Sequence, residues 1–418
     1  MDEKTVFATK GKVRNYILDD IALSILSKLP LKSLKRFGCV RKSWYLLFED
    51  THFMNMFRNN FLSNLHCGPY YDGASLLLQL NEPYYEDGFY SLSGERFENK
   101  VKLDFLNPFA NLYNFRIFGF GSINGILCLY EYDHSGKIIL LMPETQAIKI
   151  LPSYNIGSIK WFIPDDAKDF VDVRIISDVH GFGYDHVIND IKVIRYVHFI
   201  IVPSLVYPGY VEEIMSLYWS GEISLGPLWE IYSLRSNLWR KLDVSMPSSS
   251  HYTEGTQVYL GGVCHWLSEK DEEENPDGPC LVSFYLSSEV FLVTPIPSDL
   301  DDCFDVEALW INLAVINDFI ALISYHEQTT NFHISILGGL GMKESWTKLF
   351  ILGPLSCIKH PIGVGIKGEI FFQRKDEELV WFDLSTQKIE ELGYKARGCS
   401  TRIIIYKEYI LPIGGASS

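Results

Sequence analysis

The sequence predicts an α+β multidomain protein, with a small helical head followed by a mainly antiparallel, all-β domain. Apolar residues follow helical spacing near the start of the chain, within residues 16–53. From about Ala74 onward, short runs rich in Val, Ile, Phe, Tyr and Trp alternate with Gly, Pro, Asn and Asp, and a hairpin pattern recurs. The 418 residues, 47% of them hydrophobic, are enough for about two or three domains with a buried core.

The charge of the chain is unevenly distributed. The formal net charge is -15, which argues against nucleic acid as the main partner, because phosphate binding needs a basic surface. Residues 21–48 nevertheless contain six basic and no acidic side chains, whereas the other 390 residues have a net charge of -21. The head is therefore expected to attract an acidic partner, although solvated helix faces are an equally ordinary explanation of the basic residues.

Several signals of membrane, secreted and metal-binding proteins are missing from the sequence. The eight cysteines are scattered singly without a Cys-x-x-Cys pair, so no zinc knuckle is indicated. The first fifteen residues are polar and charged, unlike a signal peptide, and no apolar run reaches the length of about 18 residues that a membrane span requires. We expect an intracellular protein of the cytoplasm or nucleus, without a cofactor or a metal.

The head is predicted to contain three short helices. Asp19 or Asp20 is suited to capping the first helix, and Pro30 ends it or opens the next. The apolar faces of the three helices consist, in order, of Ile21, Ile25, Leu26 and Leu29; of Leu34 and Phe37; and of Trp44, Leu47 and Phe48. Three short helices cannot bury all these side chains among themselves, so some are expected to face a partner or the β domain.

This head resembles the F-box of plant F-box proteins. The residues that carry the resemblance are Asp19-Asp20-Ile21, Ile25-Leu26, Leu29-Pro30, Lys32-Ser33-Leu34, Arg36-Phe37, Cys39-Val40, Lys42-Ser43-Trp44 and Phe53. The chain departs from the family at Ile17-Leu18, where Leu-Pro is usual, and at Ser24, where Glu is usual. The resemblance implies a three-helix F-box over residues 13–58 that binds the Skp adaptor of a cullin-RING ubiquitin ligase. The adaptor-facing or framework set that it implies is Leu18, Ile21, Leu29, Pro30, Leu34, Val40 and Trp44.

A weak internal repeat favours a β-propeller for the rest of the chain. Four segments share the form of an apolar strand followed by a polar turn: Leu141–Gln146, Glu230–Lys241, Ser283–Glu289 and Val380–Ile389. With about 50 residues per blade, residues 70–412 would hold about six or seven blades. An irregular β-sandwich with several hairpins is the alternative.

The same region resembles the kelch-like F-box-associated domain of plant proteins. The matching segments are 121–129, 181–185, 192–195, 232–234, 239–240, 261–267, 345–349 and 379–384. They follow the F-box in the order expected of that family. The resemblance implies that residues 70–412 recruit the protein to be ubiquitinated.

Other possible sites have weaker support. Gly363-x-Gly365-x-x-Gly368 matches a dinucleotide fingerprint on paper, but a predicted strand follows where the fingerprint needs a helix, so hairpin glycines are the better interpretation. The acidic run Glu269–Glu274 lacks the spacing of a calcium loop and is interpreted as a solvated loop. His180, His186 and His198 are close in sequence, but strands are expected to separate them.

Together these features predict a non-catalytic substrate-recognition subunit of an SCF-type E3 ubiquitin ligase. Its partners would be the Skp adaptor, through it the cullin-RING ligase, and an unidentified target protein. The alternative is a β-propeller interaction or glycan-binding protein that has no ligase role.

Overall fold

The structure is a computed structural model, in which the chain divides into two compact units, residues 1–63 and residues 64–418. It describes residues 19–29, 31–38, 44, 46–63, 74–82, 85–103, 115–131, 136–153, 171–203, 228–246, 257–268, 279–297, 312–326, 328–396 and 401–407. Among these residues, no helix is long and apolar enough to cross a membrane.

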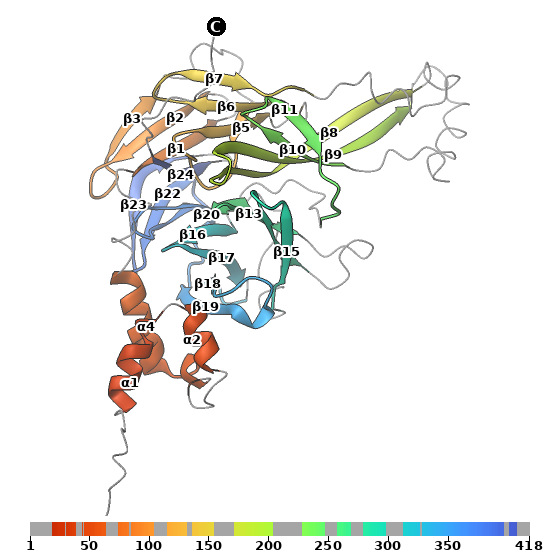
Figure 1. Cartoon of the computed structure of the whole chain (residues 1–418). Helices are drawn as coiled ribbons and strands as arrows, with labels where there is room; N and C mark the ends of the chain where they lie inside the picture. The colour runs from red at the N-terminus through yellow and green to blue at the C-terminus, as the bar shows by residue number, and fades with distance from the viewer. Residues whose placement is uncertain are drawn as a thin grey trace, which may run out of the picture. The chain divides into compact units, whose positions relative to one another are not determined.

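The first unit is helical in its described residues (Figure 1). Its elements are α1 (Asp19–Leu26), α2 (Leu31–Gly38), the 3₁₀ helix η1 (Leu46–Phe48) and α4 (Thr51–Ser63). The Asp50 side chain caps α4 by accepting a hydrogen bond of 2.7 Å from the Phe53 N–H, which satisfies one of the orphan donors of the helix start. The Asn60 amide of α4 donates to the Ser27 hydroxyl at 2.9 Å, which ties α4 to the end of α1.

A small core holds these helices together. Its buried side chains come from all four elements: Leu26, Leu31, Leu34, Leu47, Phe53, Met54, Phe57 and Phe61. The rings of Phe53 and Phe57 stack at 6.4 Å along one face of α4, as residues four apart on a helix do.

The third helix expected around Trp44–Phe48 is described only as the short η1 and a single helical residue at Trp44, while residues 39–43 and 45 lie outside the described residues. A separate helix after η1, α4, was not predicted from the sequence. Asp50, two residues after the end of η1, explains where α4 begins. Its carboxylate accepts the Phe53 N–H, which has no partner within the helix.

The second unit is a six-bladed antiparallel β-propeller, in which each blade is a four-stranded sheet. The strands of blade 1 are β24 (Arg402–Lys407), β1 (Ala74–Glu82), β2 (Tyr85–Ser93) and β3 (Asn99–Leu103). Those of blade 2 are β4 (Phe115–Ile117), β5 (Leu127–Glu131), β6 (Ile138–Met142) and β7 (Ala147–Ile150). Those of blade 3 are β8 (Val171–Asp185), β9 (Asp190–Pro203), β10 (Leu228–Ser233) and β11 (Leu238–Lys241).

The remaining blades follow the same order. Blade 4 contains β12 (Gln257–Leu260), β13 (Val263–Ser268), β14 (Cys280–Tyr285) and β15 (Val290–Pro295). Blade 5 contains β16 (Leu313–Ile316), β17 (Phe319–His326), β18 (Asn331–Leu337) and, after the 3₁₀ helix η5 (Lys343–Ser345), β19 (Trp346–Leu352). Blade 6 contains β20 (Ile358–Val364), β21 (Ile370–Arg374), β22 (Glu378–Asp383) and β23 (Lys388–Lys395).

The ring closes by pairing the two ends of the propeller in one sheet. The last strand, β24, pairs antiparallel with β1, with Leu77 opposite Ile404. Blade 1 therefore takes one strand from the C-terminal end and three from the start of the unit, and Figure 1 shows β24 beside β1. This pairing ties the C-terminal end of the propeller to its start, while each blade keeps two short edge strands.

The four hairpins that the sequence repeat predicted are all present, and they occupy the same place in their blades. Each joins the third strand to the fourth, in blades 2, 3, 4 and 6. Their turns end on Gln146, Asn237, Glu289 and Gln387, whose φ angles lie between 55° and 57°. In three of them this last residue donates its N–H to the end of the preceding strand, for example Glu289 to the Tyr285 oxygen at 2.8 Å. The sequence repeat therefore corresponds to the hairpin between the third and fourth strands of these four blades.

The core of the propeller lies between neighbouring blades. The cluster between blades 3 and 4, for example, includes Trp229, Trp266 and Phe284. Where inner strands approach closely, only glycine fits, because a Cβ on Gly363 of β20 would overlap the Ile403 main-chain oxygen of β24. Gly365 and Gly368 lie in the turn between β20 and β21. A strand follows these glycines, so the prediction of hairpin glycines is confirmed and the dinucleotide fingerprint is not formed.

Candidate functional site

Several large apolar side chains are exposed on the helical unit. Ile21 and Ile25 lie one turn apart on α1, and their side chains are 51% and 53% exposed. Phe37 of α2 and Leu46 of η1 are 39% and 43% exposed. Ile21 and Ile25 share one face of α1, and an exposed pair of large aliphatic side chains is compatible with a protein–protein contact.

The predicted adaptor-facing residues occupy different environments. Ile21 is exposed, Leu29 and Trp44 are partly exposed, and the Trp44 ring packs edge-on against Phe37 with centroids 5.9 Å apart. Leu34 is fully buried in the helical core, so it is placed to support the fold rather than to touch a partner. Leu18, Pro30 and Val40 lie outside the described residues.

The predicted list omitted three exposed apolar residues, Ile25, Phe37 and Leu46. The four-residue spacing of Ile21 and Ile25 was visible in the sequence and indicates one helix face. It could not show whether that face points inward or outward, because that depends on which side α4 packs. Leu26, next to Ile25 in sequence, faces the core instead.

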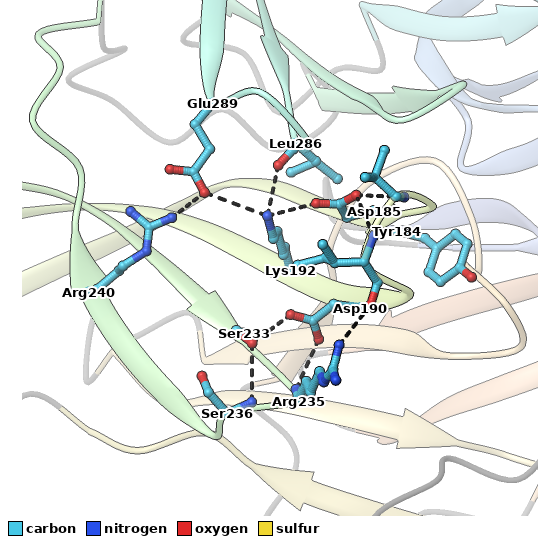
Figure 2. Close-up of polar contacts among 12 residues, drawn as sticks. Tyr184, Asp185, Asp190, Lys192, Ser233, Arg235, Ser236, Arg240, Leu286 and Glu289 are labelled. Atoms are coloured by element: carbon cyan, nitrogen blue, oxygen red, sulfur yellow. Dashed lines mark hydrogen bonds and ion pairs between the residues drawn. The ribbon is translucent and has the colours of Figure 1, made fainter.

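In the propeller, a polar network joins the turns of blades 3 and 4 (Figure 2). Lys192 of β9 is buried, and its ammonium donates to Asp185 Oδ2 and to the main-chain oxygen of Leu286, each at 2.8 Å. Glu289 lies 3.6 Å from the same ammonium and also pairs with Arg240 of β11. We call this the Asp185 network.

The second half of the Asp185 network holds the other end of the β8–β9 turn. Asp190 is buried and accepts hydrogen bonds from the Ser233 hydroxyl at 2.5 Å and the Arg235 N–H at 2.9 Å. The Arg235 guanidinium donates back to the Ile188 main-chain oxygen at 3.3 Å. Figure 2 shows Asp185 and Asp190 on opposite sides of this turn, so both of its ends are fixed by buried carboxylates.

The charge of Asp185 is retained inside the fold. Burial alone would raise the pKa of its carboxyl, but the Lys192 ammonium and the Val187 and Ile188 N–H groups together hold that pKa below its usual range. The group is therefore ionised at neutral pH. A carboxylate held in this way is suited to a structural role, since a general acid or base needs a pKa near the working pH.

His180, His265 and His360 are buried in the propeller and neutral. Burial lowers the pKa of His180 and of His360 to about 4, and that of His265 to about 3. His180 of β8 and His198 of β9 lie on different strands, and their rings lie 6.0 and 5.9 Å from the same ring, Tyr196. The β-bulge between Val179 and Gly181 shifts the register of β8 against β9, which puts the His180 and His198 side chains on the same face of the sheet.

No group of three or more metal-binding side chains is found in the part of the chain that the structure describes. The acidic run at 269–274 lies outside that part.

Residues 106–411 match the family described as the F-box associated beta propeller domain. The chain belongs to this family. The match extends over all blades except most of the first, and it agrees with the six four-stranded sheets.

Relatives of this F-box-associated propeller chain are F-box proteins of Arabidopsis thaliana. F-box protein CPR1 is 23% identical over 404 residues, which are 90% of this chain and 84% of the relative. F-box protein At3g07870 is 24% identical over 337 residues, 80% of this chain and 72% of the relative. The alignment with CPR1 therefore extends over most of this chain.

Solved structures are more distant. An oligogalacturonate lyase of Vibrio parahaemolyticus aligns with 76% of this chain and 78% of its own, at a TM-score of 0.39 and 8% identity. This degree of likeness supports no conclusion about activity.

Proposed function

We propose that this chain is the substrate-recognition subunit of an SCF-type E3 ubiquitin ligase. The observation that carries the proposal is the combination, in one chain, of the F-box residue pattern with an F-box-associated propeller. The F-box is assigned to residues 13–58 as a three-helix unit, and the target-binding domain to residues 70–412.

The docking step uses the helical unit. Ile21, Ile25, Phe37 and Trp44 supply an apolar surface that the Skp adaptor would cover. Burying a large aliphatic side chain contributes about 1.5–3 kcal/mol, so a few such residues are enough for a specific contact. The surrounding sequence, with six basic residues between 21 and 48, favours an adaptor surface with acidic groups.

The chain contributes proximity rather than bond chemistry. The head docks on the ligase, the propeller holds a target protein, and a lysine of the target is brought near the charged conjugating enzyme. The rate gain comes from the raised effective concentration of that lysine. Such a protein works where the cullin-RING ligases are found, so we place it in the cytoplasm or nucleus.

A pull-down of the full chain with the purified Skp adaptor tests the proposal. Wild type is compared with two head variants, Leu29→Lys plus Trp44→Ala and Ile21→Lys plus Ile25→Ala. The matched control is Val101→Lys plus Ile150→Ala, which alters two propeller residues that are 57% and 54% exposed. We expect the wild type and the control to retain the adaptor and both head variants to lose it.

A wild-type chain that retains no adaptor, under conditions in which another F-box protein does, would overturn the proposal. In that case the chain would be a propeller interaction or glycan-binding protein without a ligase role. If wild type and head variants retained the adaptor equally, the substituted residues would not be part of the adaptor-binding surface.

A further inference from the structure

A pocket of about 280 Å³ lies on blade 3. Tyr196 of β9 and Trp229 of β10 are opposite each other in the sheet, line the pocket together, and have ring centroids 4.9 Å apart. The other lining residues are the run Lys241–Met246, which continues the chain beyond β11. Ligand pockets begin at about 300 Å³, so this cavity is large enough for one long side chain. We call these lining residues the Tyr196 pocket.

The aromatic wall of the Tyr196 pocket is held by the packing of blade 3 against blade 4. The Trp229 ring stacks on Trp266 of β13 with centroids 5.6 Å apart, and its side chain is only 4% exposed. Leu242 and Met246 belong to the same core cluster between these blades. A wall fixed in this way loses little conformational entropy when a ligand binds.

The pocket presents polar groups that have no partner. The Leu242 N–H donates to the Trp229 main-chain oxygen at 2.8 Å, but residues 243–246 make no main-chain hydrogen bond in the part of the chain that the structure describes. The Trp229 indole N–H also has no acceptor there. Leu242 and Met246 are buried and the residues between them are exposed or half-buried, the alternation of an extended chain. Such a run can pair with an extended peptide through its main chain.

The charge near the pocket favours a basic ligand. Within the lining, Asp243 and Lys241 are both exposed and their charges cancel. Blade 4 decides the sign, because Cys280 belongs to the same core cluster and pairs with Ser268 at the end of the β13–β14 hairpin. Residues 269–278, between these strands, lie outside the described residues and carry six acidic side chains and one basic one. Since both ends of the connection are anchored, these charges stay within roughly 18 Å of them.

We propose that the Tyr196 pocket binds a Lys or Arg side chain on an extended segment of the recruited target protein. The cation would lie between the Tyr196 ring and the Asp243 carboxylate, which both attract positive charge. The main chain of the segment would pair with residues 243–246, and one of its carbonyl oxygens would accept from the Trp229 indole N–H. The proposal rests on the function proposed above in naming the recruited target as the partner. It adds the pocket and the basic character of the recognised segment.

The test uses a random dodecapeptide library displayed on phage and selected against the full chain. Selected peptides are then synthesised, and their affinities for variants of the full chain are measured by fluorescence anisotropy. We expect enriched peptides to contain Lys or Arg, and Asp243→Lys to weaken their binding by about tenfold or more. Tyr196→Leu should weaken it about fivefold, because the ring is lost, whereas Tyr196→Phe keeps the ring face and should bind as the wild type does.

Two matched controls alter the same residue types elsewhere on the propeller. Glu95→Lys reverses an exposed charge of blade 1, and Tyr285→Leu removes a half-buried ring at the far end of β14. Both should leave the affinity unchanged, and peptides with Gln in place of Lys and Arg should bind at least tenfold more weakly. Thermal unfolding of each variant separates a local effect from loss of the fold. The proposal is overturned by an absence of enriched peptides, by enrichment of acidic ones, or by equal loss in the controls.

A further variant separates the pocket from simple attraction to the acidic run. Glu272→Gln, Glu273→Gln and Glu274→Gln together should weaken binding only a few-fold and reduce its dependence on salt. Complete loss of binding in this variant, with no change in Tyr196→Leu, would place the contact on the acidic run and contradict the proposal.

Adaptor binding is measured with the same samples, which keeps this proposal separate from the ligase role. A chain that binds the peptides through the pocket but does not bind the adaptor would refute the ligase role and leave the Tyr196 pocket standing. A chain that binds the adaptor but none of the peptides would refute the pocket alone.

Discussion

The ammonium of Lys192 lies 2.8 Å from Asp185 Oδ2 and the same distance from the main-chain oxygen of Leu286. A single buried side chain therefore joins blade 3 to blade 4 and fixes the β8–β9 turn. Because Lys192 and Asp185 are both buried, neither charge can be solvated if the other is removed.

We expect Lys192→Met to lower the free energy of unfolding by about 3 kcal/mol, because it leaves the Asp185 carboxylate buried without its cation. Urea unfolding of the full chain measures the change. The control is Arg374→Met, which removes ion pairs with Asp376 and Glu391, both largely exposed, and should cost less than about 1 kcal/mol. Equal costs for the two variants would show that the Lys192 contact is not important for stability.

The neutral state of His265 predicts a dependence of stability on pH. Burial lowers the pKa of this imidazole to about 3, whereas in the unfolded chain it is near 6.5. The unfolded chain therefore binds the proton more readily, so stability from this group is present above about pH 6.5 and decreases as the pH falls towards 3.

Between pH 7 and pH 5 this single group should remove about 2 kcal/mol from the free energy of unfolding. His265→Gln cannot take up the proton, so the difference in stability between wild type and variant should shrink by that amount over the same interval. Urea unfolding at the two pH values measures it. A difference that stays constant would mean that the His265 imidazole is protonated as easily in the folded chain as in the unfolded one.

The two classes of apolar residue in the helical unit should respond differently to substitution. Leu34→Ala opens a cavity in the core and should destabilise the unit by about 2–5 kcal/mol. Ile21→Asp alters a side chain that is 51% exposed and should change stability by less than about 0.5 kcal/mol. Thermal unfolding, followed by circular dichroism at 222 nm as the helix signal, measures the stability of the two variants. Similar destabilisation by Leu34→Ala and Ile21→Asp would mean that Ile21 is buried in a core.

The close approach of β20 and β24 makes a further prediction. Gly363→Ala would place a methyl group against the main-chain oxygen of Ile403, so one of the two inner strands must move. In Gly261→Ala the added methyl group meets no atom within 4 Å, so the only cost is that of a non-glycine residue at a φ of 56°, about 1 kcal/mol. The Gly363 variant should therefore unfold at a clearly lower urea concentration than the Gly261 variant. The reverse order would contradict the strand contact.

Much of this fold follows from local sequence signals. The repeated hairpins were predictable because a polar turn between apolar strands, closed by a residue such as Asn237, is a short-range pattern. The number of blades was left at six or seven because the closing pair, β24 with β1, joins residues more than three hundred positions apart. Nothing in either strand alone specifies that pairing.

The candidate surfaces were only partly predictable for a related reason. The spacing of Ile21 and Ile25 indicates a helix face, but the packing of α4 decides which side is covered. The Asp185 network was not predicted, because it joins Asp185 and Lys192 of the β8–β9 hairpin to Arg240 of β11 and to Glu289 of blade 4, which meet only when blades 3 and 4 pack together. Buried charge pairs of this kind leave no periodic signal in the sequence.

The most direct test of the account is reconstitution of the full chain with purified Skp adaptor, cullin and RING subunits, followed by size-exclusion chromatography. We predict that the chain co-elutes with all three, that Tyr196→Leu plus Asp243→Lys co-elutes equally, and that Ile21→Lys plus Ile25→Ala elutes alone. A wild-type chain that elutes alone, while a known F-box protein enters the complex under the same conditions, would contradict the account.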